Sequence, residues 1–198
     1  MIKQIVFDNG GVIVSSSSRF FLPKFLRYTD KTLSSLVHSY RELAHDLDTG
    51  KESEKSFYAR FTKHMALRCH WRTIHKLRYG VTRLIPGMTK LVHDLSQHYP
   101  LYMLNNEYRE FMDFLLRKFS YFQYFRHRLT SCDTGLRKPD QKFFELFLKK
   151  FNLKASECLF IDDREDNIHT AHKLGFQVIR FENHRQVMHE LRRIGVKV

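Results

Sequence analysis

The sequence is poor in cysteine, glycine and proline, and it contains no long apolar segment. Its 198 residues include three cysteines, eight glycines and four prolines. This composition excludes collagen-like repeats, disulfide-rich scaffolds and flexible low-complexity linkers. No apolar run approaches the roughly 18 residues that a membrane-spanning helix needs. We therefore expect a globular protein without a membrane partner.

The three cysteines, Cys69, Cys132 and Cys158, lie far apart in the sequence. None of them forms the CxxC spacing of a zinc site, and their odd number argues against a disulfide framework. We expect buried, reduced thiols. The N-terminal segment MIKQIVFD reaches an acid too early for a secretory signal peptide, so we expect a cytoplasmic protein.

Acidic residues are scarce relative to basic ones. The 21 Asp and Glu face 34 Lys and Arg, which gives a formal net charge of +13. Such a charge favours anionic partners, such as phosphorylated metabolites or nucleic acid. No acid occurs between Lys55 and His93, a stretch rich in Lys and Arg. This stretch predicts an electropositive surface, and an ordinary solvated face is the alternative.

The apolar pattern predicts strands that alternate with helices over most of the chain. Buried-strand patterns cover residues 2–7, 101–106, 127–133, 157–162 and 176–181. Helical patterns cover residues 88–98, 107–119, 140–151, 166–174 and 183–194. This alternation predicts an α/β fold, a Rossmann-like parallel sheet with helices on both faces.

One all-helical block, residues 19–80, breaks this alternation after the first strand. Its apolar residues recur at three- and four-residue intervals, and Ser53 is a candidate cap for one of its helices. We expect an insertion that covers the sheet as a helical cap. The predicted division is a core domain of residues 1–14 and 86–198 and a cap domain of residues 15–85.

Polar residues follow four of the predicted strands at their carboxyl ends, where open α/β sheets bind ligands. They are Asp8 with Gly10 and Gly11, Asn105 with Asn106, Lys138, and Asp162 with Asp163 and Asn167. Carboxylates suit Mg²⁺, which prefers a few carboxylates, waters and a substrate phosphate. Lys138 and the amides would hold that phosphate. Each residue alone has an ordinary explanation as a turn, a cap or a surface charge, but together they predict one phosphate site.

These residues carry a resemblance to a known family. FDNGGV at 7–12, LNN at 104–106, GLRKPD at 135–140 and FIDDREDNI at 160–168 resemble the four motifs of the haloacid dehalogenase-like (HAD) hydrolase superfamily. The motifs have the family's order and spacing, and the resemblance covers essentially the whole chain. The helical block is similar to the cap of subfamily I. The phosphatase-like branch is the most similar part of the family.

The resemblance implies a role for each matching residue. Asp8 would be the nucleophile that forms an aspartyl-phosphate, and Lys138 would neutralise charge on the phosphate. Asn105 and Asn106 would bind the phosphoryl group. The Mg²⁺ ligands would be Asp8, the backbone carbonyl of Gly10, and Asp163. Asp162 and Asn167 would support the metal site without binding the ion themselves.

Two positions depart from the family pattern. Most phosphatases of the superfamily carry an acid–base Asp where this chain has Gly10, and such a group is worth about 10²–10⁴ in rate. Asn105 stands in place of a Ser or Thr. Glu107 is close enough in sequence to the second motif to be considered as a replacement acid, whereas Asn9 cannot titrate.

The cap normally selects the substrate in the family. On a helix, Arg68, Arg72, His75 and Lys76 would lie roughly along one face and could line a cleft that binds anions. Nucleic-acid docking with Trp71 stacking is another interpretation of this segment. We favour a basic outer face with Trp71 packed in the cap.

We therefore expect a Mg²⁺-dependent phosphatase acting on a small phosphorylated metabolite through Asp8. The alternative is a catalytically weak or inactive relative that binds an acidic partner or nucleic acid through its basic cap. Dehalogenation is disfavoured because dehalogenases of the superfamily do not need Asp162 and Asp163. The aromatic segment 111–125 fits a homodimer face or the core, so both a monomer and a homodimer agree with the sequence.

Overall fold

The computed structural model describes residues 1–198. Five parallel strands form one sheet in the order β3-β2-β1-β4-β5. The strands are β1 (Gln4–Phe7), β2 (Leu101–Asn105), β3 (His127–Thr130), β4 (Cys158–Asp162) and β5 (Gln177–Arg180). All five predicted strands are present, and the predicted parallel α/β sheet is confirmed. The third strand ends earlier than predicted, because residues 131–133 turn into the 3₁₀ helix η3 (Ser131–Asp133).

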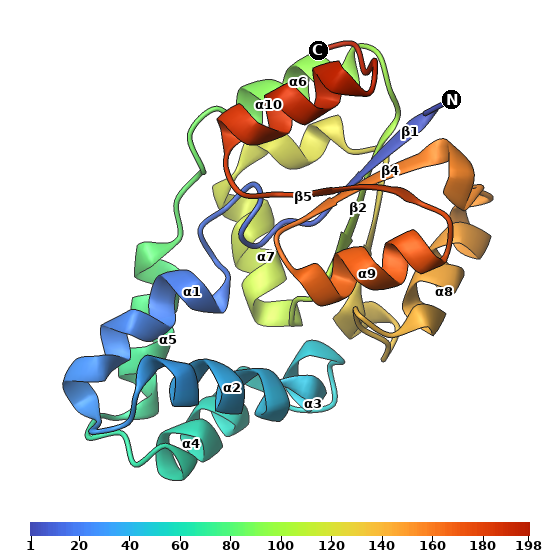
Figure 1. Cartoon of the computed structure of the whole chain (residues 1–198). Helices are drawn as coiled ribbons and strands as arrows, with labels where there is room; N and C mark the ends of the chain where they lie inside the picture. Colours follow the sequence, from blue (N-terminus) through green and yellow to red (C-terminus); the bar gives the residue numbers. More distant parts are fainter.

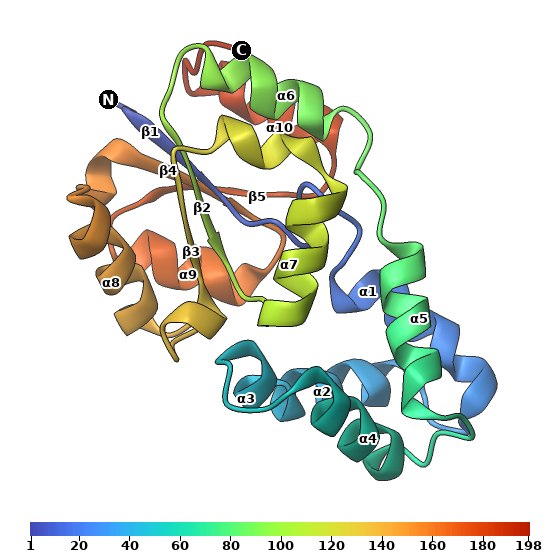
Figure 2. The same ribbon diagram turned by 180° about the vertical axis from the view of Figure 1, so that it is seen from behind.

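Helices cover both faces of the sheet (Figures 1 and 2). They are α6 (Met88–Ser96), α7 (Arg109–Lys118) and α10 (His184–Arg193) on one face, and α8 (Gln141–Phe151) and α9 (Glu165–Lys173) on the other. Because side chains alternate along a strand, β1 serves both layers: Ile5 and Phe7 join one hydrophobic cluster and Val6 joins the other. Short 3₁₀ helices, η2 (Ser120–Tyr124) and η4 (Ala155–Glu157), precede β3 and β4.

A separate group of helices lies beyond the carboxyl end of β1, away from the two chain termini (Figure 1). We call it the helical layer. It consists of α1 (Ser18–Phe21), the 3₁₀ helix η1 (Leu22–Tyr28), α2 (Leu33–Leu43), α3 (His45–Asp48), α4 (Glu54–His64) and α5 (Trp71–Val81). Ser53 caps α4 as predicted, since its side chain accepts a hydrogen bond from the Ser56 N–H at 3.3 Å.

Two chain passages connect the helical layer to the sheet, and they run side by side. Ser15 N donates to the Arg83 carbonyl at 2.8 Å, and Ile85 N donates to the Ile13 carbonyl at 2.9 Å. The Ser15 hydroxyl also bonds to the Val81 carbonyl at 3.1 Å. This paired connection fixes where the layer leaves and rejoins the sheet.

The structure also shows how deeply the cysteines, Trp71 and the aromatic segment 111–125 are buried. All three cysteines are free, but only Cys158 is buried, whereas Cys69 and Cys132 are partly exposed, so the prediction of buried thiols holds for one of them. Trp71 packs, partly buried, against the main hydrophobic cluster. In the aromatic segment 111–125, Phe111, Leu115 and Tyr121 are buried in that cluster, and five further aromatic residues pack against it while partly buried. No helix has the length and apolar character needed to cross a membrane.

Candidate active site

Asp8 is the first residue after β1, and it meets Lys138 at the carboxyl edge of the sheet. Lys138 Nζ donates to Asp8 Oδ1 at 2.8 Å and to Asp162 Oδ2, at the end of β4, at 2.7 Å. Lys138 is only 1% exposed. Since β1 and β4 are neighbours, the sheet order brings the two carboxylates together around one buried ammonium.

Asp162 is fully buried and its two carboxylate oxygens are both occupied. Asn167 Nδ2 donates to them at 3.0 and 2.9 Å, and the Arg164 N–H donates to Oδ1 at 2.8 Å. Together with Lys138, these donors satisfy Asp162 within the protein. Asp162 therefore holds Lys138 in place and has no free oxygen facing the solvent.

Asp163 differs from Asp162 in this respect. Its Oδ1 is buried and has no hydrogen-bond partner, and its Oδ2 lies 3.7 Å from Arg19 Nη1. One carboxylate oxygen from each of Asp8, Asp162 and Asp163 lies within 4.8 Å of the others. Hard oxygen donors with an unpartnered buried oxygen are what a bound Mg²⁺ needs, so the residues present fit this ion.

Glycine at position 11 allows Asp163 to lie close to the loop that follows β1. Its φ is +96°, a conformation that favours glycine. A Cβ at residue 11 would also lie 2.3 Å from Asp163 Oδ2, closer than any real contact. Glycine at position 11 thus meets both a backbone and a packing requirement.

The electrostatics of the site reflect an excess of negative charge. Burial raises the pKa of Asp8 to about 7 against the opposing effect of Lys138, and it raises the pKa of Asp163 to about 6, with Asp162 adding to it. Burial works against the charge of Lys138, but Asp162 and Asp8 outweigh it and raise its pKa. Asp8 and Asp162 share the ammonium of Lys138, and Asp163 has only the longer contact with Arg19, so three carboxylates face two cations.

The two asparagines at the carboxyl end of β2 lie in different places. Asn106 binds the loop that carries Lys138: its Nδ2 donates to the Lys138 carbonyl at 2.7 Å, and its Oδ1 accepts from the Lys138 N–H at 2.8 Å. Asn105 accepts from Thr130 Oγ1 at 3.1 Å and contacts Met112 Sδ. The structure therefore does not bring Asn105 to the site as predicted. Asn105 is in register with Thr130 of β3, and its amide is buried between Thr130 and Met112.

A cavity of about 130 Å³ opens over Asp8, between the sheet edge and the helical layer. Its cationic lining residues are Arg19, Arg41, Arg78, Arg137, Lys138 and Arg164. Its acidic lining residues are Asp8, Asp48, Glu107 and Asp163. Tyr40 and Ala44 are the two hydrophobic residues among the 18 that line it. The cavity is therefore strongly polar, with more positive than negative groups.

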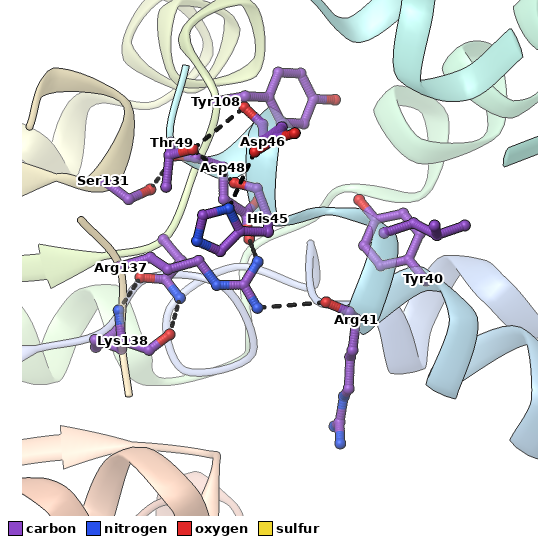
Figure 3. A network of polar contacts seen from close by, with 12 residues as sticks. Tyr40, Arg41, His45, Asp46, Asp48, Thr49, Tyr108, Ser131, Arg137 and Lys138 are labelled. Atoms are coloured by element: carbon purple, nitrogen blue, oxygen red, sulfur yellow. Dashed lines mark hydrogen bonds and ion pairs between the residues drawn. The ribbon is translucent and has the colours of Figure 1, made fainter. Parts of the chain in front are cut away.

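Besides the Arg19–Asp163 contact, two shorter ion pairs join the helical layer to the sheet at this cavity. Arg78 of α5 donates to both oxygens of Glu107 at 2.9 and 3.0 Å, and both side chains are buried. Arg137 donates to Asp48 Oδ2 of α3 at 2.9 Å (Figure 3). Because Arg137 precedes Lys138, α3 packs directly against the loop that supplies the buried ammonium.

The residues that the helical layer contributes to the cavity are not those of the alternative in which the acid-free stretch lines a cleft. Arg68, Arg72, His75 and Lys76 do not line it, whereas Tyr40, Arg41, Ala44, Asp48 and Arg78 do. Arg68 instead pairs with Asp30, and His75 lies 3.1 Å from Glu54. Acids from other parts of the chain thus offset part of the charge of the acid-free stretch.

The chain matches a known family over most of its length. The family described as haloacid dehalogenase-like hydrolase matches residues 2–175. D-ribitol-5-phosphate phosphatase of Bacteroides thetaiotaomicron is 26% identical over 193 residues, covering 92% of this chain and 93% of that protein. Sesquiterpene phosphatase astK of Aspergillus oryzae is 26% identical, covering 97% and 96%. Drimenol cyclase drtB of Aspergillus calidoustus is 24% identical, and the chain spans only 37% of its length.

Solved structures share the fold. A HAD family enzyme of Bacteroides thetaiotaomicron, in complex with magnesium and inorganic phosphate, superposes with a TM-score of 0.78 at 18% identity, covering 97% of this chain and 100% of that one. A HAD-like hydrolase from Porphyromonas gingivalis gives 0.76 at 22% identity, with full coverage of both chains. The four motifs, the sheet order and the family match agree: this chain belongs to the haloacid dehalogenase-like hydrolases.

Proposed function

We propose that the protein is a phosphatase that hydrolyses a small phosphomonoester through an aspartyl-phosphate on Asp8. The observation that carries the proposal is the contact of Asp8 with the buried Lys138, beside the unpartnered Asp163 oxygen. A carboxylate nucleophile divides the hydrolysis into two easier steps. Lys138 would neutralise part of the charge of both the phosphate and Asp8, which otherwise repel each other. The phosphatase relatives support this reaction type.

We propose Mg²⁺ as the cofactor, held by Asp8, the backbone carbonyl of Gly10, and Asp163. The ion would offset the negative charges of the carboxylates and the phosphate. Asp162 and Asn167 would not bind the ion themselves: Asp162 would hold Lys138 in place, and Asn167 would orient Asp162. Asn106 would position the Lys138 loop, and we assign no substrate contact to Asn105. The magnesium and phosphate in the related solved structure support this assignment.

The lining of the cavity favours a polar substrate. The relatives include phosphatases named for a polyol phosphate and for sesquiterpenes. Pockets for large apolar ligands are lined mainly by apolar side chains and have volumes of roughly 300–1,000 Å³. Here Tyr40 and Ala44 are the two hydrophobic lining residues, and the volume is about 130 Å³. A short, hydrophilic phosphomonoester fits this lining better than a terpenoid phosphate.

We also propose that residues 15–85 act as the cap domain over a core of residues 1–14 and 86–198. The paired passages around Ser15 and Arg83 would be the hinge between them. The cap residues Tyr40, Arg41 and Asp48 would then contact the part of the substrate that lies beyond the phosphate.

The test is phosphate release from a panel of phosphomonoesters, with Mg²⁺ and with EDTA. We expect release that requires Mg²⁺ and that Asp8→Asn abolishes, with the circular dichroism spectrum of the variant unchanged. Thr134→Val, a change outside the cavity, serves as the control and retains activity. Undiminished release by Asp8→Asn, or release that EDTA leaves intact, would contradict the proposal.

A further inference from the structure

The site contains no carboxyl group that is free to protonate a leaving group. Of the four acids that line the cavity, Asp8 binds Lys138 and Asp163 is the proposed metal ligand. The other two are bound by arginines across the interface: Asp48 by Arg137, and Glu107 through both of its oxygens by Arg78. Expulsion of an alkoxide usually needs such a proton donor, which contributes about 10²–10⁴ in rate.

The Ser16 hydroxyl lies next to the position that a side chain on residue 10 would take. Gly10 has no side chain, and Ser16 Oγ lies 2.9 Å from the position that a Cβ on residue 10 would take. Ser16 is 1% exposed, yet its Oγ has no hydrogen-bond partner, and the same is true of the buried Ser17 Oγ. Both residues line the cavity with Asp8. Buried hydroxyls without partners call for a ligand or water that bonds to them.

A hydroxyl differs from a carboxylic acid in what it can do there. It does not give up its proton near neutral pH, but it can donate a hydrogen bond to an oxygen that carries negative charge. The cationic lining around it, including Arg19 and Arg41, further favours an anionic product. The site is thus arranged for a leaving group that departs as a stable anion.

We propose, on the basis of the proposed function, that the substrate is a phosphate ester of an acidic group, namely an acyl, enol or aryl phosphate, whose leaving oxygen accepts hydrogen bonds from Ser16 and Ser17. Asp8 attacks phosphorus, the bond from phosphorus to the leaving oxygen breaks, and the electron pair leaves with that oxygen as a carboxylate, enolate or phenolate. Water then attacks the phosphorus of the aspartyl-phosphate. Asp8 is released as a carboxylate, and both protons of the water remain on the inorganic phosphate.

The experiment measures kcat/KM with Mg²⁺ for acetyl phosphate, p-nitrophenyl phosphate, phenyl phosphate and glycerol 3-phosphate. We expect the first two to exceed glycerol 3-phosphate by about 10²–10⁴, since nothing in the site replaces the missing proton donor. Rates for glycerol 3-phosphate within about threefold of p-nitrophenyl phosphate would overturn the inference while leaving the phosphatase proposal intact. Release from none of the four would instead overturn the phosphatase proposal.

Two variants test the role of the hydroxyl. Ser16→Ala should lower kcat about tenfold for phenyl phosphate and less for acetyl phosphate, because a poor leaving group depends more on the hydrogen bond. A merely structural role would lower both rates equally. The control is Ser15→Ala. The Ser15 hydroxyl bonds outside the cavity, so its loss should leave the ratio of the two rates unchanged.

A double variant, Gly10→Asp with Ser16→Gly, supplies the missing carboxyl group and the space for it. It should raise the rate of glycerol 3-phosphate hydrolysis, and no gain in a folded double variant would contradict the inference.

Discussion

At the scale of single residues, the charges around Lys138 do not balance. Lys138 bonds to Asp8 and Asp162, and Asp163 lies beside them; the pKa is raised to about 7 for Asp8 and to about 6 for Asp163. A buried acid whose pKa is raised holds its proton at a pH where a solvated acid has lost it. In the metal-free protein, protons therefore occupy part of the site that a divalent cation would use.

This competition predicts that Mg²⁺ affinity falls as the pH falls. Below its pKa each acid is protonated, so the ion must displace a proton from it; above pH 8 both acids are already ionised. We expect the Mg²⁺ dissociation constant, measured by calorimetry, to rise at least about tenfold from pH 8 to pH 6. Repeating the titration in buffers with different ionisation enthalpies should reveal proton release near pH 6.5. An affinity that is constant over this range would contradict the account.

At the scale of elements, a buried ion pair joins α5 of the helical layer to the loop after β2. Arg78 and Glu107 are 5% and 6% exposed at their side chains, and the pair is bidentate. Arg78 also donates to the Tyr40 hydroxyl at 3.1 Å. Burial raises the pKa of Glu107 to about 7, and Arg78 opposes this shift. The contact therefore depends on both partners being present.

Removing one partner should be costly because the other is left buried without a counter-charge. We expect Glu107→Ala to lower the free energy of unfolding by about 3–5 kcal/mol, measured by urea denaturation. The matched control is Asp94→Ala, which breaks the exposed Lys90–Asp94 pair on α6 and should cost under about 1 kcal/mol. Equal, small losses in both variants would show that the buried pair does not hold the two parts together.

At the scale of the whole molecule, the net charge of +13 acts on any anionic substrate before it reaches the cavity. Arg41 lines the cavity, is exposed and forms no ion pair, so its charge is available to an incoming anion. Long-range attraction of this kind accelerates encounter and weakens when salt screens it.

We expect kcat/KM for a phosphomonoester to fall several-fold when ionic strength rises from about 10 mM to about 150 mM, as the Debye length shortens from about 30 Å to about 8 Å. Arg41→Gln should reduce this salt dependence. Arg27→Gln, an exposed arginine of the same helical layer that does not line the cavity, is the matched control and should retain it. A kcat/KM that does not respond to salt would rule out electrostatic attraction of the substrate.

The sheet and the polar residues at its edge could be predicted because both follow local rules. Apolar runs mark the strands, and Asp8, Asp162 and Asp163 follow the runs directly. Packing between distant segments could not be predicted in this way. Asn105 is predicted to bind the phosphate, but in the structure its side chain bonds to Thr130, because its direction depends on the register with β3.

The cavity wall illustrates the same limit. A cleft lined by Arg68, Arg72, His75 and Lys76 is the less favoured interpretation of the helical pattern, and Arg78 with residues of α2 and α3 lines the cavity instead. Which face of the helical layer meets the sheet depends on contacts such as Asp48 with Arg137, and these residues are 89 positions apart. Periodicity along one helix contains no information about such a partner.

The most direct test of the central claim is detection of the covalent intermediate. The protein is mixed with Mg²⁺ and acetyl phosphate, quenched in acid within a single turnover, digested and analysed by mass spectrometry. We expect a phosphoryl group on the peptide that contains Asp8. This group should disappear from the peptide as inorganic phosphate is released. Phosphate release with no modified Asp8 at any time, or a phosphoryl group on a different residue, would contradict it.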